Sequence, residues 1–263
     1  MIDLHTHILP AVDDGAPDMD VSLAMARAAV VAGVHTMVAT PHVNERYDLD
    51  PMDIGEHVGR LNLTLARTGI ALAVLPGAEV AHSRAGGLSD RDLRATCLGG
   101  HSALLIESPY TPSPFFDEFL FDLQLRGFRP VLAHPERCPM FQSDVDRVAA
   151  LVARGILCSV NTGSLAGRFG RTARRTAVEL LRRGLVHSLA SDCHDTERRP
   201  PGLRDGLNAV RDDIPGIEVL GDWLTAEVPA ALVAGAKLPP RPALPERPPS
   251  RWARVRRRRG GEA

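Results

Sequence analysis

Short apolar segments alternate along this chain with longer amphipathic ones, and this order restricts the folds that the chain can adopt. Seven segments have the length and the apolar or β-branched character of buried strands, namely residues 2–5, 36–40, 71–75, 103–106, 130–133, 157–160 and 186–190. Five segments between them repeat apolar residues at helical spacing, namely 18–32, 52–68, 114–126, 144–154 and 171–183. A glycine follows each of the five, where a left-handed helix end is favoured, and a short helix is expected near residues 90–96.

Strands that alternate with helices in this way pair in parallel through right-handed crossovers. With 263 residues and 44% hydrophobic content, the chain can bury one large α/β core. Seven strands predict a TIM-like barrel one strand short of the usual eight, over residues 1–236, and an open doubly wound sheet is the alternative.

Residues 237–263 differ in composition from the rest of the chain. They carry nine Lys or Arg against two Glu, a balance of +7, so the formal net charge of −1 leaves about −8 for residues 1–236. A segment rich in proline and arginine buries little apolar surface, so we expect a disordered basic tail. We interpret this tail as a segment that makes an electrostatic contact, and we expect its partner to be an anionic membrane or an acidic protein rather than a specific nucleic acid. The alternative is a solvated chain end without a partner.

The chain shows no signal-peptide pattern at its start and no apolar run near the ~20 residues of a membrane span. We therefore expect a cytoplasmic location.

Histidines and carboxylates follow six of the seven predicted strands. Along the chain they are His5, His7, Asp14, His42, Glu79, Glu107, His134, Asp192 and His194. The carboxyl ends of the strands of a parallel barrel share one face, where the connecting loops build active sites. We therefore expect these nine side chains to converge at one mouth.

Each of these side chains alone has an ordinary structural explanation, such as a hydrogen-bonded histidine or a salt-bridged carboxylate. Five histidines and four acids at one mouth, however, would leave buried charges unpaired unless cations neutralised them. That many ligands exceed one tetrahedral site and indicate two or three divalent ions. Imidazole and carboxylate ligands suit manganese, iron or zinc.

Clustered divalent ions commonly generate hydroxide and hold both oxygens of a phosphoryl displacement. Arg137, in the segment "HPER", fits such a site because its planar fork can bind two phosphate oxygens. A salt bridge from Arg137 to Glu136 or to another acid is the alternative. Tyr110, with Phe115 and Phe116, is a candidate lining for a phenyl slot, unless these rings pack in the core.

Cys193 and Arg199 have the Cys-x5-Arg spacing of cysteine-dependent tyrosine phosphatases. The residues between them are acidic and contain no glycine, so their backbone does not favour wrapping a phosphate. We reject this mechanism and expect Cys193 to fill space between two ligands.

Six segments, "DLHTHILPAVDDG", "ATPH", "GAE", "LIE", "LAHPER" and "SDCH", follow one another in this order. They resemble the PHP (polymerase and histidinol phosphatase) superfamily, and within it the bacterial PHP-type protein-tyrosine phosphatases of capsule and exopolysaccharide operons. The resemblance covers about residues 1–235. It implies a distorted (β/α)7 barrel, a trinuclear site usually loaded with manganese, and dephosphorylation of a membrane-associated tyrosine autokinase that controls polysaccharide export.

The resemblance also implies how the ligands are shared between three metals. A first metal would take His5, His7, Glu79 and Asp192, a second would take Glu79 as a bridge with Glu107 and His134, and a third would take Asp14, His42 and His194. Arg137 resembles the phosphate-binding arginine of the family.

The sequence thus predicts a metal-dependent phosphotyrosine-protein phosphatase that acts through metal-bound hydroxide. A small-molecule phosphatase, such as one for histidinol phosphate, is the second hypothesis, because it uses the same metal machinery. A catalytically silent regulatory protein that acts through its basic tail is the third.

Overall fold

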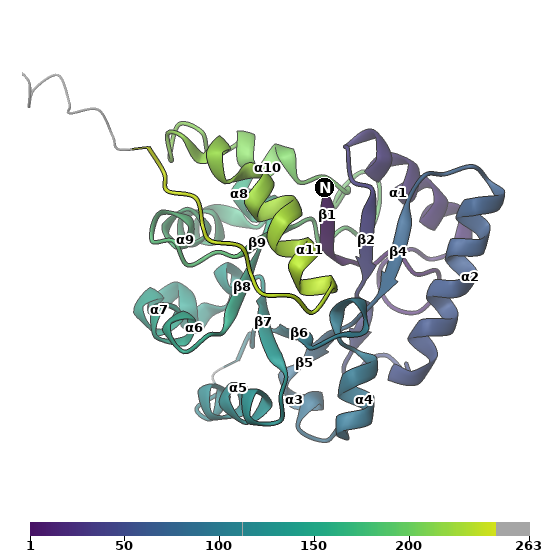
Figure 1. Ribbon diagram of the computed structural model, residues 1–263, viewed down its shortest axis with the longest axis horizontal. Helices are drawn as coiled ribbons and strands as arrows, with labels where there is room; N and C mark the ends of the chain where they lie inside the picture. Colours follow the sequence, from purple (N-terminus) through teal and green to yellow (C-terminus); the bar gives the residue numbers. More distant parts are fainter. Residues whose placement is uncertain (112, 246–263) are drawn as a thin grey trace, which may run out of the picture.

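The computed structural model of the chain describes residues 1–111 and 113–245. Its strands form two sheets, and every strand pairing in them is parallel (Figure 1). One sheet has the order β1 (Ile2–Thr6), β2 (Thr36–Ala39), β4 (Ala73–Pro76). The other has the order β3 (His42–Val43), β5 (Glu79–Ala81), β6 (Ala103–Glu107), β7 (Arg129–Ala133), β8 (Leu157–Asn161), β9 (Ser188–Ala190).

The two sheets are connected in two places, through the chain between β2 and β3 and between β4 and β5, and through hydrogen bonds between β1 and the loop after β9. The strands β3 and β5 follow β2 and β4 after two residues each, so the chain passes directly from one sheet to the other. At the opposite end, the His7 N–H donates to the Cys193 carbonyl at 2.9 Å, and the Asp192 N–H donates to the His5 carbonyl at 2.9 Å. The loop after β9 is thereby held against the end of β1.

The strand order follows the sequence in each sheet, without the reversal that a doubly wound sheet requires. The parallel α/β architecture predicted from the sequence is confirmed, and the closed barrel stays a prediction.

The five predicted helices are present, with ends that differ from the predicted ones by one or two residues. They are α1 (Met19–Val31), α2 (Ile54–Arg67, after a 3-10 turn at Pro51–Asp53), α5 (Phe116–Leu125), α7 (Val145–Ala153) and α9 (Gly170–Arg182). Figure 1 shows these helices around the outside of the strands. The Asp18 carboxylate caps α1 by accepting from the Val21 N–H at 2.9 Å. The glycine after α1, Gly33, has the positive φ of 80° that a left-handed helix end requires.

Short helices occupy several loops. They are α3 (His82–Ala85), α4 (Asp90–Ala95), α6 (Pro139–Ser143), α8 (Thr162–Leu165), α10 (Arg204–Asn208) and α11 (Val228–Val233). Only α4 was expected, because a helix of one or two turns shows too little periodicity to be recognised. None of the helices in the described part of the chain is long and apolar enough to cross a membrane.

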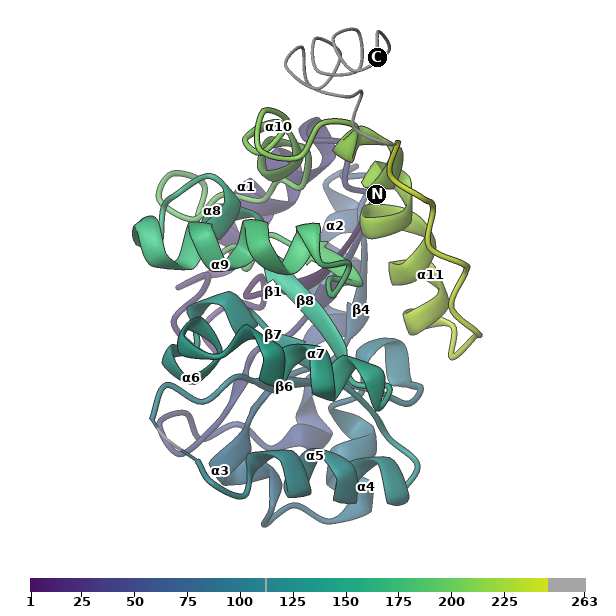
Figure 2. The same cartoon turned by 90° about the vertical axis from the view of Figure 1, so that its left-hand side faces the viewer.

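The first part of the predicted tail differs from the expectation of disorder. Residues 237–245 run along the body beside α11 (Figure 2). The Trp223 indole N–H donates to the Pro239 carbonyl at 3.2 Å, and the Arg241 guanidinium lies 5.9 Å from the centre of the Trp223 ring. Leu238 and Leu244 pack against the core. The composition of the segment could not reveal that Leu238 and Leu244 find an apolar surface on the body of the protein. The remaining part, including the arginines at 256–259, lies outside the described residues.

We expect a chain that ends at residue 236 to be less stable than one that ends at residue 245. The shorter chain exposes Trp223 and loses the two leucines, which should cost about 2–4 kcal/mol in free energy of unfolding. For a domain of this size, that corresponds to a melting temperature lower by roughly 5–10 °C. Thermal unfolding followed by circular dichroism measures the difference, and equal melting temperatures would show that this segment contributes nothing.

Candidate metal centre

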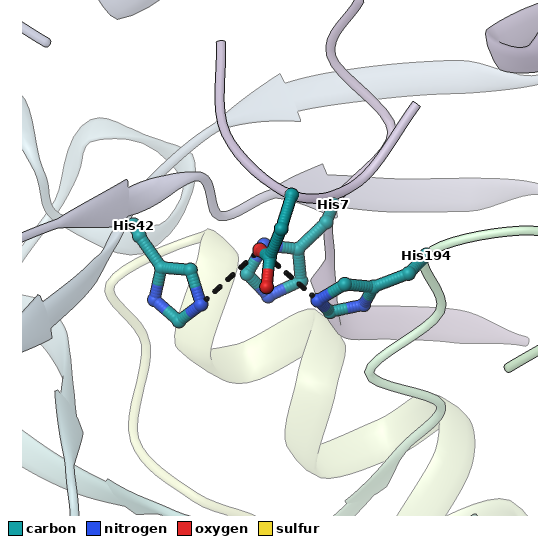
Figure 3. Close-up of side chains that lie close together, drawn as sticks. His7, His42 and His194 are labelled. Carbon is teal, nitrogen blue, oxygen red and sulfur yellow. Dashed lines mark ion pairs between the residues drawn. The ribbon is translucent and has the colours of Figure 1, made fainter. Parts of the chain in front are cut away.

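Seven of the nine predicted ligands lie at the carboxyl ends of strands or in the loops that follow them, whereas His42 and Glu79 are the first residues of β3 and β5, which follow β2 and β4 after two residues each. The ligand atoms of the nine residues form four overlapping groups, in each of which all atoms lie within 4.8 Å of one another. The groups are His7, Asp14, His42 and His194; His5, His7 and Glu79; His5, His134 and Asp192; and His42, Glu79 and Glu107. Figure 3 shows the rings of His7, His42 and His194 converging on a shared carboxylate.

The first group surrounds the Asp14 carboxylate. Its Oδ1 atom lies 3.5 Å from Nε2 of His42 and 3.4 Å from Nε2 of His194. These three residues are the set that the family resemblance implied for a third metal, and His7 joins them.

The Glu79 carboxylate lies between the other groups. Its Oε2 atom is 3.2 Å from Nε2 of His5 and 3.1 Å from Nδ1 of His42, and its Oε1 atom is 2.8 Å from Nε2 of His134. Glu107 groups with Glu79 and His42 rather than with His134. The structure therefore brings all the residues together but divides them differently from the implied first and second sets.

Two of the candidate ligands have strained backbones. His134 has φ 34° and Asp192 has φ 54°, in the left-handed region that residues other than glycine seldom occupy. Such conformations cost on the order of 1–3 kcal/mol each, and they concentrate at functional sites. The His134 N–H donates to the Ser159 carbonyl at 2.9 Å, and the corresponding bond of Asp192 reaches His5. The backbone at the tips of β7 and β9 is thus held in the turn that directs both side chains into the mouth.

The "VDDG" segment folds back over His7. A Cβ atom on Gly15 would lie 2.1 Å from the His7 carbonyl oxygen, so only glycine fits at this position. The close approach lets the Asp13 carboxylate reach Nδ1 of His7 at 2.6 Å. Asp13 also accepts hydrogen bonds from the backbone N–H groups of Gly15 and His42, both at 3.0 Å.

Asp13 is a site residue that the sequence analysis missed. By binding Nδ1 of His7 it leaves Nε2 directed at the metal-ligand cluster, which is how carboxylates usually orient metal-binding histidines. The sequence carried a signal for this role, since Asp13 adjoins Asp14, but nothing local shows which of the two neighbours faces the cluster.

The electrostatics of the mouth suit a cation. Burial lowers the pKa of His42, His134 and His194, which favours the neutral imidazole that binds a metal. Burial raises the pKa of Glu107 to about 7, and the neighbouring charge of Glu79 adds to the shift.

The carboxylate of Glu79 shows the opposite shift. Burial alone would raise its pKa, but the charges of His5 and His134 outweigh burial and hold the pKa well below its usual range. Among the described residues, Nδ1 of His42 and Nε2 of His194 are buried and lie close to the Glu79 and Asp14 carboxylates, but neither forms a well-aligned hydrogen bond. A cluster of imidazoles and carboxylates with buried nitrogens that lack such a bond is a donor set that fits divalent ions.

Arg137 lies at the edge of this cluster. Its Nη1 atom donates to Oδ2 of Asp192 at 2.9 Å, and its guanidinium lies 4.3 Å from the centre of the Phe169 ring. The structure thus shows the salt bridge to another acid that was considered as an alternative, with Asp192 as the partner, and no pairing of Arg137 with Glu136 among the described residues. Glu136 is fully buried and accepts instead from the Asn161 N–H at 3.1 Å and the Ser164 hydroxyl at 2.6 Å.

Asn161 and Phe169 at this edge were missed by the sequence analysis, and Arg199 was considered there only as part of the rejected Cys-x5-Arg motif. Arg199 donates to the same Asp192 oxygen as Arg137 and lies 5.7 Å from the Phe169 ring. The Asn161 side-chain amide donates to this oxygen at 2.8 Å. No local pattern links these residues, because the contacts join loops that are far apart in the sequence.

The aromatic residues near the mouth separate into two kinds. The Tyr110 ring lies 5.7 Å from the Arg137 guanidinium and is 46% exposed, whereas Phe116 is fully buried in the core and Phe115 points to solvent. Beside Tyr110 is a hollow of about 600 Å³, lined also by Pro114, Pro139 and Met140.

Cys193 is fully buried, and burial raises the pKa of its thiol. A buried neutral thiol is a poor nucleophile, which agrees with its predicted role as a space-filling residue.

Parallel strands with a cluster of imidazoles and carboxylates at their carboxyl ends define a parallel α/β protein with a candidate polynuclear metal centre. The family model described as "Capsular polysaccharide synthesis, CpsB/CapC" matches residues 1–217, and the chain belongs to this family. The tyrosine-protein phosphatase YwqE of Bacillus subtilis is 41% identical over 204 residues, which cover 76% of this chain and 79% of that protein. The putative tyrosine-protein phosphatase CapC of Staphylococcus aureus is 30% identical, covering 79% of this chain and 82% of its own length.

A solved structure agrees with these relatives. It comes from a study of YwqE from Bacillus subtilis and CpsB from Streptococcus pneumoniae, described as unique metal-dependent tyrosine phosphatases. It is 33% identical, with a TM-score of 0.82, and covers 94% of this chain and 100% of that chain. The lactonase Lmo2620 from Listeria monocytogenes, 12% identical with a TM-score of 0.53, shares the fold alone.

We expect Asp13→Asn to lower metal affinity by about 10- to 100-fold, because the amide no longer holds His7 in its orientation. Metal content after dialysis at graded metal concentrations measures the loss, and activity should return at high metal. Asp20→Asn, at an exposed carboxylate in the first turn of α1, is the control. If both variants retain metal equally well, Asp13 has no orienting role.

Proposed function

We propose that this protein is a metal-dependent phosphotyrosine-protein phosphatase built on a closed (β/α)7 barrel, with residues 1–236 as the catalytic unit. One observation carries the proposal. The cluster of imidazoles and carboxylates lies directly beside two arginines, Arg137 and Arg199, and both of them pair with Asp192, which is itself a member of the cluster. Relatives named as tyrosine phosphatases, up to 41% identical, support the same activity.

The proposed metal ligands are His5, His7, Asp14, His42, Glu79, Glu107, His134, Asp192 and His194. Divalent ions held by them, for which we propose manganese with iron or zinc as alternatives, would lower the pKa of a water molecule and stabilise charge on the phosphate oxygens. The protein supplies fixed ligand positions on buried strands, with Asp13 orienting one imidazole.

We assign phosphate binding to Arg137, with Arg199 beside it. Both guanidinium groups lie near the Phe169 ring, at 4.3 and 5.7 Å from its centre, and each donates one N–H edge to Asp192, which leaves its other N–H groups for a phosphate. Two guanidinium groups beside one another can donate to several oxygens of a phosphate. These hydrogen bonds become stronger as negative charge develops on the transferring group. The Arg137 side chain is 21% exposed, so a phosphate can reach it from solvent.

The substrate that we propose is a phosphotyrosine protein. The Tyr110 ring, 5.7 Å from the Arg137 guanidinium, offers an aromatic wall where a phenyl ring can lie. The family description concerns capsular polysaccharide synthesis. We therefore propose a membrane-associated tyrosine kinase of that process as the protein substrate, and a cytoplasmic location for the reaction.

Removal of the metal tests the first part of this proposal. Prolonged dialysis against EDTA should reduce hydrolysis of a phosphotyrosine peptide by at least about a hundredfold, since the water then keeps its ordinary pKa, and manganese should restore the activity.

Cys193→Ser should retain most of the rate in the metal-loaded protein. Full activity without metal would contradict the proposal, and faster turnover of histidinol phosphate than of the peptide would assign a small-molecule substrate.

Arg137→Ala should lower kcat/KM for the phosphotyrosine peptide by roughly a hundredfold, because losing one charged contact to the transferring group costs about 3 kcal/mol. Arg137→Lys should recover only part of the rate, since an ammonium cannot form two parallel hydrogen bonds. Arg27→Ala, at an exposed position on α1, is the control.

Metal content must be measured on the same preparations, because Arg137 contacts Asp192. Loss of rate with metal retained supports the phosphate role. Loss of rate together with metal would mean that Arg137 acts by holding Asp192 instead.

A further inference from the structure

Arginines are concentrated on α9 and in the residues directly before and after it. They are Arg168, Arg171, Arg174, Arg175, Arg182 and Arg183. Three have carboxylate partners, because Arg174 and Arg182 pair with Asp213 at 2.6 and 4.0 Å, and Arg183 pairs with Asp146 at 2.6 Å.

The other three form what we call the α9 basic surface, namely Arg168, Arg171 and Arg175. All three are exposed, and among the described residues no carboxylate oxygen lies within 4.0 Å of their nitrogens. Residues 1–236 carry a formal net charge of about −8, so a surface with three arginines and no paired carboxylate is unusually positive for this protein. Such a patch attracts anionic groups from solvent.

The α9 basic surface adjoins the candidate active site. The helix begins at Gly170, directly after Phe169, whose ring lies against the Arg137 guanidinium. It also packs against the short turn Pro135–Arg137 that carries Arg137. Figure 2 shows α9 lying between α8 and α6. A hollow of about 610 Å³ runs along the helix. Its lining includes Arg171, Arg174, Arg175 and Arg182 together with the carboxylates of Glu179 and Asp213, and Asp213 pairs with Arg174 and Arg182 rather than with Arg171 or Arg175.

An extended peptide advances about 3.3 Å per residue. Because Phe169 contacts Arg137 and directly precedes α9, a chain whose phosphotyrosine lies at Arg137 can reach the α9 basic surface within a few residues. The exposed groups that it meets there are guanidinium groups, whose planar forks match carboxylates.

We propose that the α9 basic surface binds acidic residues near the phosphotyrosine of a protein substrate, so that the enzyme prefers acidic phosphopeptides. This inference rests on the proposed phosphatase function and deepens it by naming the class of substrate sequence. The surface lies outside the candidate metal centre and acts on substrate affinity rather than on the chemical step.

A membrane surface fits this region less well than a peptide does. A helix that lies on a membrane needs an exposed apolar face, whereas the apolar residues of α9, among them Ala177, Leu180 and Leu181, are buried against the body. None of the large exposed hydrophobic side chains in the described residues belongs to α9.

The test compares two synthetic phosphotyrosine peptides of equal length on the metal-loaded full chain. One carries glutamates on both sides of the phosphotyrosine, and the other carries glutamines at the same positions. The acidic peptide should have a kcat/KM at least about fivefold higher, mainly through KM, as expected for a few rim charge pairs. The ratio should fall toward 1 as NaCl is raised from about 0.05 to 0.5 M.

The double variant Arg171→Glu/Arg175→Glu should bring the ratio of the two kcat/KM values to about 1 or below. Arg27→Glu on α1 adds the same kind of charge change at a distance from the site and should leave the ratio unchanged. If the double variant loses its metal or its folded circular dichroism spectrum, Arg171→Gln/Arg175→Gln replaces it, with the same expected direction.

The outcomes separate this inference from the function on which it rests. No turnover of either peptide by the metal-loaded protein would overturn the proposed function itself. Turnover of both with equal kcat/KM, or a preference that survives the double variant, would leave the phosphatase function standing and overturn the inference. Loss of binding to phosphatidylglycerol vesicles in the double variant, without a change in the peptide ratio, would assign the surface to a membrane and would also overturn it.

Discussion

The Asp192 carboxylate is the point at which the metal-ligand cluster, the arginines and the ends of the strand order meet. Its Oδ1 atom faces the Nε2 atoms of His5 and His7 at 3.5 and 3.4 Å, while its Oδ2 atom accepts from Arg137, Arg199 and Asn161. Its backbone N–H bonds to β1. Burial alone would raise its pKa, but the charges of His5 and Arg199 and a hydrogen bond from His7 hold the pKa well below its usual range. An anion so deeply buried must be balanced by several cationic groups, and this requirement fixes the arrangement of the loops around it.

This constraint explains why the site has two sides. One oxygen of Asp192 faces the proposed metal ligands His5 and His7, and the other accepts from the arginines that we assign to phosphate. The proposed metal and phosphate positions are therefore neighbours of one carboxylate, and a displacement of its backbone would disturb both. The left-handed conformation at this residue costs stability, and it is retained where the geometry of two binding functions depends on it.

The sequence predicted the positions of the nine candidate ligands because their placement follows from a local rule. In parallel strands, a side chain at the carboxyl end of each strand must share one face with the others, whatever the details of packing. His5 on β1 and His7 directly after it needed only that rule. Asp13, Asn161, Arg199 and Phe169 contribute through contacts between distant loops, and no local periodicity encodes such contacts. The packing of residues 237–245 was missed for the same reason, since the Trp223 ring that they cover is separated from them in the sequence.

The two groups of site residues also differ in how firmly they are held, and this difference bears on specificity. The histidine ligands of β1 and the Glu79 ligand lie on buried strands, with at most 2% exposure, where a change in sequence disturbs the core. The arginines at the edge lie on a short turn and on loops, and those of α9 lie on an exposed helix face. Substitutions there alter charge at the surface with little effect on packing. In the function that we propose, metal binding and peptide preference thus rest on different residues, so substitutions of the exposed arginines would alter the preferred peptide and leave the metal ligands in place.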